Sequence, residues 1–320
     1  MSIGNCAREL SFHRTRGNFS TLASNVVFLE LKVEIFANRR MTGTILGLSF
    51  ELSACPAKSW KALSPYMSAI SKRSSINATI KLILFIGIGV GTYLIWMLGM
   101  FVVHNKIAWR RLIFHKYSTL FLRFSNLKIE VIGQPPNPPF LLVANHLSYV
   151  DIAVIRSVAE TIFVAKSDVK GWFLAGRFIR DMGTVFVNRD NHRDVLRVQG
   201  EIFERLDAGE SITFFPEGTS TNGKEVLKFN SSLFDLAAKR NFPVYAAAIS
   251  YQVEQAGFKA STMVCWWDET AFITHLWRLF TLERVSASVH FCSSPLCNSN
   301  RKELAGDLHE LISTHFVPCD

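Results

Sequence analysis

Residues Leu82–Val103, LILFIGIGVGTYLIWMLGMFVV, form an apolar run that contains no charged residue. A helix needs about 20 apolar residues to cross the hydrocarbon core of a bilayer. The run is long enough to span a membrane and too long for the core of a signal peptide. A buried helix or a helix lying in the membrane plane is the alternative, because glycines interrupt the run and cations flank both ends. We expect a membrane-embedded helix here.

Basic residues flank this run unequally, with a stronger cluster on its C-terminal side: Lys72, Arg73 and Lys81 precede it, and Lys106, Arg110, Arg111, Lys116 and Arg123 follow it. Because cationic segments stay on the cytoplasmic side of a membrane, this bias predicts that the rest of the chain lies on the cytoplasmic face. Residues 106–124 also place Trp, Leu and Phe among the cations at helical spacing. Two interpretations stay open for them: a helix on an anionic membrane surface, or a helix packed against the domain.

The chain as a whole is both basic and apolar. Its formal net charge is +9, and 49% of its 320 residues are hydrophobic. A bilayer surface fits these values better than nucleic acid does, because no basic-aromatic module is present. The six cysteines are scattered without metal-ligand spacing, which favours reduced structural thiols and gives no support for a zinc or other metal site.

Changes of composition predict three regions: a poorly defined N-terminal extension over residues 1–75, the membrane-embedded and interfacial helices over 76–125, and an α/β domain over 126–320. The extension has apolar patches but no sustained periodicity. Met67 stands shortly before two cations and the apolar run, which is typical of the start of a membrane-anchored chain. We therefore expect the first 66 residues to be dispensable or to arise from an upstream start codon.

From about residue 126 onward, apolar runs alternate with helical patterns. The expected strands are Phe140–Ala144, Thr161–Ala165, Thr184–Val187, Ile212–Phe215, Val244–Ser250 and Val285–Phe291. The expected helices are Ile152–Glu160, His192–Leu206, Ser231–Arg240 and Arg301–His315. This alternation predicts an α/β fold in which helices flank a sheet of mixed strand direction.

The segment NHLSYVD places His146 at the end of an apolar strand and Asp151 five residues later. Residues five apart on a regular helix point about 140° apart, so the two side chains meet only if His146 lies on the loop and Asp151 hooks back from the first helical turn. Asp151 would then orient the imidazole, and its other nitrogen would act as a general base. Alternatively, Ser148 and Asp151 form a capping box, and His146 has no catalytic role.

Three further segments put polar groups at strand ends, where ligands bind in α/β sheets. In GTVFVNR, Arg189 follows a short expected strand, and in AKSDV, Lys166 lies at a strand end. In FFPEGTSTNGK, Glu217 lies in a glycine-bearing turn after a strand. Arginine and lysine at such positions suit a phosphate or another anionic head group. Each segment alone is also compatible with a solvated charge or a capped turn.

Taken in order, NHLSYVD, GTVFVNR, FPEGTS and FPVYAAAI resemble the glycerolipid acyltransferase family typified by 1-acyl-glycerol-3-phosphate acyltransferases. The resemblance extends from about Leu82 to the C-terminus. It implies transfer of a fatty acyl chain from acyl-CoA or acyl-carrier protein to the free hydroxyl of a lysolipid at the bilayer. The thioester is then a co-substrate, and no cofactor is implied. The hydroxyl attacks the thioester directly, which fits the absence of a G-x-S-x-G nucleophile motif.

The resemblance also implies roles for individual residues. His146 would be the general base and Asp151 would orient it. Arg189, with Lys166, would hold the acceptor's phosphate; Glu217 would fix the turn or contact the acceptor, and amides near Gly218 would be candidate oxyanion donors. The implied substrate-binding set is Asn145, Ser148, Lys166, Gly183, Phe186, Arg189, Phe215, Pro216, Glu217, Gly218 and Thr219.

Two departures from the family pattern bear on specificity. Ser220 stands where members specific for lysophosphatidic acid commonly have arginine, which favours other lysolipid acceptors, including lyso-ornithine lipid or lysophosphatidylcholine types, although Lys224 could restore the charge. Ala246 replaces a second proline, which alters local backbone stiffness. A transacylase or hydrolase, and a catalytically inactive membrane module, are the competing functions.

Overall fold

The structure, a computed structural model, describes residues 40–45, 48–53, 70–172 and 175–319. The chain divides into two compact units, Met1–Ala54 and Cys55–Asp320. In the first unit, strands β1 (Arg40–Ile45) and β2 (Leu48–Ser53) form an antiparallel hairpin. The predicted dispensability of residues 1–66 concerns a region of which the structure describes only this hairpin.

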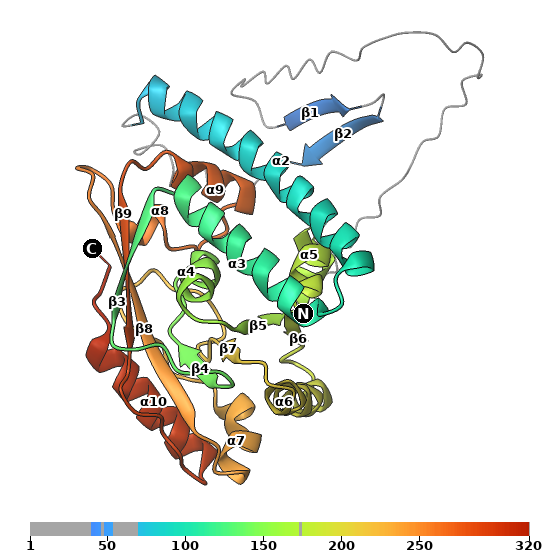
Figure 1. Cartoon of the computed structure of the whole chain (residues 1–320). Helices are drawn as coiled ribbons and strands as arrows, with labels where there is room; N and C mark the ends of the chain where they lie inside the picture. Colours follow the sequence, from blue (N-terminus) through green and yellow to red (C-terminus); the bar gives the residue numbers. More distant parts are fainter. Residues whose placement is uncertain (1–39, 46–47, 54–69, 173–174, 320) are drawn as a thin grey trace, which may run out of the picture. The chain divides into compact units, whose positions relative to one another are not determined.

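A seven-stranded sheet forms the centre of the second unit, with strand order β3-β9-β8-β4-β7-β5-β6 (Figure 1). Neighbouring strands run parallel, except that β8 and β9 are antiparallel. The strands are β3 (Leu127–Ile132), β4 (Leu141–Ala144), β5 (Ile162–Lys166), β6 (Val185–Val187), β7 (Ile212–Phe214), β8 (Val244–Val253) and β9 (Val285–Phe291). The predicted mixed α/β sheet is confirmed.

Strand β4 shows why the central strands read as continuous apolar runs. Successive side chains of a strand point to opposite faces. Leu142 and Ala144 belong to the hydrophobic core on one face, whereas Leu141 and Val143 belong to the core on the other. Helices cover both faces, so both sets must be apolar.

Different helices pack against the two faces of the sheet and contribute to the two hydrophobic cores. On the first face these are α2 (Lys72–Val102), α3 (Lys106–Phe124), α4 (Val150–Val158), α8 (Ala260–Met263) and α9 (Phe272–Phe280). On the second face these are α6 (His192–Asp207), α7 (Asp235–Lys239) and α10 (Arg301–His315). Figure 1 shows α10 and α3 on opposite sides of β8.

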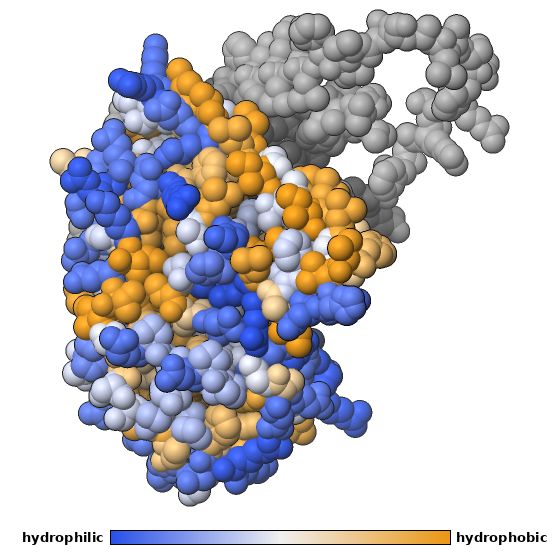
Figure 2. Space-filling view, in the orientation of Figure 1, coloured by the Kyte–Doolittle hydropathy of each residue, from blue (hydrophilic) through white to orange (hydrophobic). Residues whose placement is uncertain are grey.

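Helix α2 is, within the described part of the chain, the helix long and apolar enough to cross a membrane, and only 6% of its most apolar stretch is buried. Figure 2 shows hydrophobic side chains along it, and Phe101 is 88% exposed. One side nevertheless packs on the domain. Phe85 stacks on Tyr117 of α3, and Trp277 of α9 donates to Thr79 at 3.1 Å. The helix therefore presents one apolar side to its surroundings and one to the protein.

Helix α3 packs into the domain. Its residues Ile113, Phe114, Phe121 and Leu122 are buried, and they belong to the core on the first face of the sheet. Among the two interpretations of this segment, the structure supports the helix packed against the domain. Its aromatic spacing fills the layer between α2 and α4.

Some elements were not expected from the sequence. Strand β3 alternates apolar and polar residues but is mostly exposed at the sheet edge. Helices α5 (Ala175–Asp181), α8 and α9 are too short for a sustained period of 3.6 residues. The helix predicted over Ser231–Arg240 is wrong in detail, because a 3-10 turn precedes the short α7 there.

Candidate active site

The loop after β4 is fixed by Asn145, whose side chain is completely buried. Its Nδ2 donates to the carbonyl of Ile249 at 2.9 Å, and its Oδ1 accepts from the amide of Ile249 at 2.7 Å. Both polar ends of the amide are therefore engaged by the neighbouring strand β8. Asn145 holds the end of β4 in place instead of facing a substrate.

His146 and Asp151 meet at this loop, with Nδ1 of the imidazole 2.8 Å from Oδ2 of the carboxylate. The same Oδ2 accepts the amides of Leu147 at 2.7 Å and Ser148 at 3.0 Å. Asp151 is in the first turn of α4 and completely buried. It hooks back over the loop, as the catalytic interpretation requires, and it also makes the carboxylate half of the capping box.

The serine half of that capping box is not formed. The buried hydroxyl of Ser148 has no hydrogen-bond partner in the described part of the chain, and the residue before α4 is Tyr149. The two interpretations of the segment are therefore compatible. One carboxylate supports the start of α4 and holds the imidazole.

The imidazole of His146 is oriented for proton transfer. A carboxylate only accepts hydrogen bonds, so Nδ1 carries the proton and Nε2 is left with its lone pair. The ring stacks on Phe215, with centroids 4.2 Å apart and 15° between the planes. Its side chain is 22% exposed. In the described residues no hydrogen bond involves Nε2, which can therefore accept a proton from a bound hydroxyl.

His275 shows the contrasting case of a structural histidine. It is completely buried; its Nδ1 lies 3.0 Å from the hydroxyl of Tyr149 and its Nε2 lies 3.1 Å from the carbonyl of Cys265. Burial, with a smaller effect from Arg278, lowers its pKa to about 3. Both ring nitrogens are engaged and the ring stays neutral, so His275 cannot act as the base.

Glu217 joins two of the sequence motifs. Its Oε1 accepts the amide of His146 at 2.6 Å, and its Oε2 accepts the amide of Leu227 at 2.8 Å. Burial raises the pKa of Glu217 to about 7, an effect that these two N–H donors offset only in part. With both oxygens used, Glu217 fixes the turn after β7 against the histidine loop.

The raised pKa of Glu217 should make the free energy of unfolding depend on pH. Because its folded pKa of about 7 exceeds the ordinary glutamate pKa of 4.5, the folded chain retains a proton that the unfolded chain has released. The free energy of unfolding therefore falls as the pH rises from about 5 to 8, on the order of 3 kcal/mol from this group. Urea titrations should show wild type losing stability relative to Glu217→Gln over this range. Parallel curves would contradict the assignment.

Arg189 lies against the same turn, although it is 29 residues away in the sequence. Its Nη1 donates to the carbonyl of Gly218, and burial lowers its pKa. Gly218 has a φ of +82°, and a Cβ there would lie 2.5 Å from Nη1 of Arg189. Glycine is required at this position by both the backbone and the close arginine.

The amide of Gly218 is not an open oxyanion donor, because it donates to the carbonyl of Phe215 at 3.2 Å. The turn closes on itself through this bond. Pro216 is buried within this turn, and its carbonyl accepts a hydrogen bond from the amide of Asn230 at 2.8 Å. Thr219 is exposed. Thr219 is thus the residue of FPEGT whose side chain remains accessible.

The other predicted residues lie on or beside strands β5 and β6. Lys166 ends β5 at the same edge of the sheet, where its exposed ammonium lies 2.6 Å from Asp168. Phe186 is in the middle of β6 and half-buried. Gly183 precedes β6 and is thus at the opposite edge; a Cβ there would meet the guanidinium of Arg110 at 2.9 Å. We therefore assign Gly183 to packing and not to substrate contact.

Tyr251 is a site residue that the sequence did not reveal. Its hydroxyl donates to Oδ1 of Asp151 at 2.7 Å, and its side chain is only 1% exposed. It comes from β8, adjacent to β4 in the sheet. A tyrosine within a buried aliphatic strand was the available signal, because a buried hydroxyl needs a partner.

Replacing Tyr251 with phenylalanine should lower kcat about tenfold. Losing one hydrogen bond to Asp151 is expected to raise the activation free energy by about 1.4 kcal/mol, which corresponds to that factor. The KM values should not change, because Asp151 keeps its N–H donors and the substrate sites are untouched. Tyr245→Phe on the same strand is the matched control. A Tyr251→Phe enzyme with wild-type kcat and merely a lower Tm would show a structural role only.

The segment after α8 ties the two motif loops together. The amide of Trp266 donates to the carbonyl of Leu147 at 2.9 Å, and the hydroxyl of Ser220 donates to the carbonyl of Trp266. The amide of Thr221 donates to the carbonyl of His146 at 3.0 Å. The site is therefore built from one cross-linked set of loops at the carboxyl ends of parallel strands.

Comparisons with known proteins show which family this chain resembles in sequence. Residues 128–250 match the family model described as Acyltransferase. A 1-acyl-sn-glycerol-3-phosphate acyltransferase of Neisseria gonorrhoeae is 31% identical over 163 residues, which cover 50% of this chain and 63% of that protein. A lyso-ornithine lipid O-acyltransferase of Pseudomonas aeruginosa is 30% identical over 186 residues, covering 58% and 70%.

The fold is likewise shared with a solved structure. The crystal structure of the 1-acyl-sn-glycerophosphate (LPA) acyltransferase PlsC of Thermotoga maritima matches with a TM-score of 0.55 at 22% identity, covering 76% of this chain and 96% of that one. The alignment with the neisserial relative spans less than two thirds of that relative's length. The chain belongs to the acyltransferase family whose members include 1-acyl-sn-glycerol-3-phosphate and lyso-ornithine lipid acyltransferases.

Proposed function

We propose that this chain is a membrane-bound lysolipid acyltransferase that moves a fatty acyl chain from acyl-CoA or acyl-carrier protein to the free hydroxyl of a lysolipid. The observation that carries the proposal is the His146–Asp151 pair, with Nδ1 held at 2.8 Å and Nε2 left to accept a proton. The pair lies at the edge of the sheet where Arg189 and Glu217 also lie. Family membership supports the same chemistry.

The reaction needs one base and no covalent intermediate with the protein. Nε2 of His146 takes the proton as the acceptor oxygen attacks the thioester carbonyl. The resulting imidazolium is stabilised by the carboxylate of Asp151. Collapse of the tetrahedral intermediate breaks the carbon–sulfur bond, and the proton on Nε2 passes to the departing thiolate. The ester product and the free thiol leave, and the imidazole is neutral again.

Arg189 is the group that we assign to an anionic part of the acceptor. One of its nitrogens is committed to Gly218, which leaves the rest of the planar guanidinium for a phosphate. Its burial strengthens electrostatic contacts relative to bulk water. Its position beside the FPEGT turn places it near the same loops as the imidazole.

Replacing Arg189 with alanine should raise the KM for a phosphorylated acceptor about 10- to 100-fold, as expected for losing charge-assisted hydrogen bonds of 1.5–3 kcal/mol. The KM for acyl-CoA should change much less. Arg189→Lys, which keeps the charge without the planar fork, should be intermediate. Steady-state kinetics with each substrate varied in turn tests this, and equal effects on both KM values would contradict the phosphate role.

Two acceptors remain candidates. Lysophosphatidic acid is supported by Arg189 and by the name of the neisserial relative, and lyso-ornithine lipid by the names of several relatives, including one from Rhizobium meliloti that is 42% identical over 125 residues. Ser220 also favours the second, because its hydroxyl is bonded to Trp266 and supplies no charge. Lys224 is exposed in the same loop and is a second cation available to a phosphate.

The membrane is the second part of the proposal. The exposed side of α2 would enter the bilayer while its other side stays on α3 and α9, and the excess of cations after α2 supports a catalytic domain on the cytoplasmic face. This location brings the imidazole close to an acceptor that resides in the bilayer. It leaves the thioester to arrive from water.

The deciding experiment is acyl transfer from labelled acyl-CoA and acyl-carrier protein to a panel of lysolipids, with membranes containing wild type or His146→Ala. Labelling of one lysolipid class by wild type alone supports the proposal and identifies the acceptor. Free fatty acid released without acceptor labelling would indicate a hydrolase. A labelled product formed only when a phospholipid is the donor would indicate a transacylase.

A further inference from the structure

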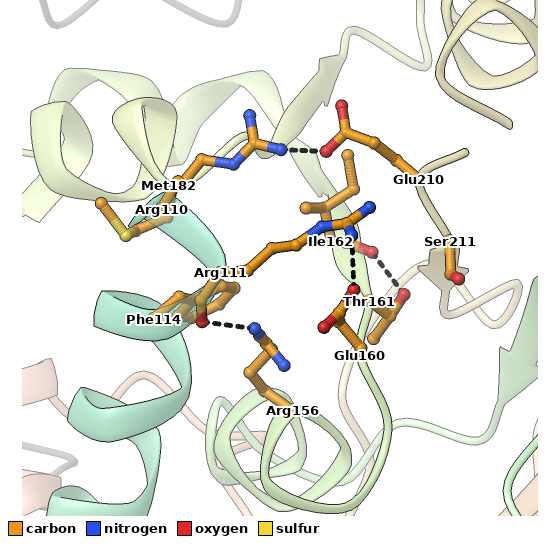
Figure 3. Close-up of a pocket in the computed structure, with 10 residues that line it drawn as sticks. All are labelled: Arg110, Arg111, Phe114, Arg156, Glu160, Thr161, Ile162, Met182, Glu210 and Ser211. Atoms are coloured by element: carbon orange, nitrogen blue, oxygen red, sulfur yellow. Dashed lines mark hydrogen bonds and ion pairs between the residues drawn. The ribbon is translucent and has the colours of Figure 1, made fainter. Parts of the chain in front are cut away.

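Arginines cluster at the edge of the sheet opposite the site described above. Thr161 and Ser211 immediately precede β5 and β7, whereas the motif residues follow the ends of these strands. Arg110 and Arg111 reach this edge from α3, and Arg156 reaches it from α4 (Figure 3). No part of the proposed acyl transfer uses these three side chains.

Two of the three arginines have carboxylate partners. Nη1 of Arg111 lies 2.7 Å from Oε1 of Glu160, and Arg110 pairs with Glu210. Glu210 is shared, because Nη1 of Arg205 lies 2.9 Å from its other oxygen. The carboxylates at this edge are thus already occupied by cations.

Arg156 is the remaining cation, and none of the ion pairs found in the described part of the chain includes it. It is 3% exposed. Its Nη2 donates to the carbonyl of Arg111 at 2.6 Å and its guanidinium lies 5.3 Å from the ring centroid of Phe114, but its buried Nε has no hydrogen-bond partner in the described residues. Burial lowers its pKa to about 10, so it stays charged at neutral pH. Glu160, which is paired with Arg111, also acts on Arg156 as the nearby opposite charge. One carboxylate thus serves two guanidinium groups, and the remaining positive charge is unfavourable in a buried position unless a ligand neutralises it.

A groove with a volume of about 500 Å³ opens between α3 and α4 beside this guanidinium. Arg111, His115 and Arg156 line it together with Glu160, the partner of Arg111, and the half-exposed apolar Leu112. Small-molecule sites in proteins have volumes of this order, with few polar groups among apolar ones. Figure 2 shows hydrophilic and hydrophobic patches side by side over α3 and α4. The α3–α4 groove therefore offers cations and an apolar wall.

We propose that the α3–α4 groove is a second binding site, separate from the acyl-transfer site, that takes a phosphate group through Arg156 and Arg111. Guanidinium groups bind phosphate oxygens in a bidentate fashion and remain charged at every physiological pH. A phosphate would neutralise the positive charge that Arg111 and Arg156 together carry in excess of Glu160. The phosphate can belong to the head group of an anionic phospholipid, with Leu112 toward the acyl chains, or to a soluble phosphate compound.

Binding of inorganic phosphate to the full chain in a neutral detergent tests the site. Thermal unfolding is followed against phosphate concentration at constant ionic strength, in an Arg189→Ala background that removes the phosphate site of the proposed function. We expect phosphate to raise the Tm of this chain. Adding Arg111→Gln, whose side chain is 29% exposed, should weaken the apparent Kd about tenfold or more, because charge-assisted hydrogen bonds of at least 1.4 kcal/mol are lost.

Arg284→Gln provides the matched control, since Arg284 is also paired with a glutamate, at 3.3 Å, but is outside the groove. It should leave the Kd unchanged. Arg156→Lys keeps the buried positive charge and is therefore expected to fold. It should bind phosphate more weakly than the Arg189→Ala background, because the planar guanidinium is lost. A Tm that phosphate does not raise in the Arg189→Ala background overturns the inference and leaves the proposed function intact. Equal Kd values for Arg111→Gln and Arg284→Gln also overturn it.

Vesicle flotation then distinguishes the two sources of phosphate. Wild type, Arg111→Gln and Arg284→Gln are compared on phosphatidylcholine vesicles with and without phosphatidylglycerol. Loss of the preference for anionic vesicles in Arg111→Gln alone assigns the site to a lipid head group. An unchanged preference, together with the weakened phosphate Kd, assigns it to a soluble phosphate compound.

Discussion

Replacing His146 with alanine is expected to lower kcat for acyl transfer about 10³-fold, within the 10²–10⁴ range for general-base catalysis. The acceptor hydroxyl then has no group to take its proton, because Nδ1 and Nε2 are both removed. The KM values should change little, since the ring contacts the reacting oxygen and not the head group. Rates measured with saturating acceptor and thioester test this result directly.

The control for this variant is His309→Ala. His309 is also part-buried and hydrogen-bonded, to the carbonyl of Val226 at 3.0 Å, but it is on α10 on the other face of the sheet. It should retain wild-type kcat. If His146→Ala kept a rate within threefold of wild type, the imidazole would not be the base and the proposed mechanism would fail.

Replacing Asp151 with asparagine is expected to lower kcat about 10²–10⁴-fold while the chain still folds. The amide oxygen can accept the hydrogen bonds that Oδ2 now accepts from His146, Leu147 and Ser148, and the hydroxyl of Tyr251 can rotate to accept from the amide nitrogen. The imidazolium, however, loses the negative charge that stabilises it. The rate falls, and the Tm falls far less than in Asp151→Ala, where all four donors lose their acceptor.

Combining the two changes separates catalysis from structure. If Asp151 acts through His146, the double variant His146→Ala, Asp151→Asn should be no slower than His146→Ala alone, because groups that act as a unit are non-additive. Multiplication of the two rate losses would mean that Asp151 contributes by an independent route. The same cycle with Tyr251→Phe measures how far the hydroxyl works through the carboxylate.

The positions of most strands of the sheet could be predicted from local sequence. The apolar run ending at Ala144 and the stretch Val285–Phe291 were predicted as strands, and they form β4 and β9. Period-2 and continuous apolar patterns carry this information because each side chain's burial is set by its own strand. Strand β3 and helix α9 were missed, the first because it is an exposed edge and the second because it is short.

The chemistry of the site was visible in part. The spacing of His146 and Asp151 limited them to one arrangement in which they meet, and that arrangement is present. The sequence could not decide between catalysis and capping, since both use the same carboxylate. It also could not assign Glu217, whose two oxygens reach amides 71 and 10 residues away.

The apolar helix, the α/β alternation and the polar residues at strand ends could be predicted from local sequence, because each depends on the residues of one segment. The folded chain was needed to show that Tyr251 donates to Asp151, that Asn145 is hydrogen-bonded to Ile249 and that Gly183 packs against Arg110. Those contacts depend on which strands are neighbours in the sheet. Strand order follows from packing the whole chain, and no local pattern encodes it.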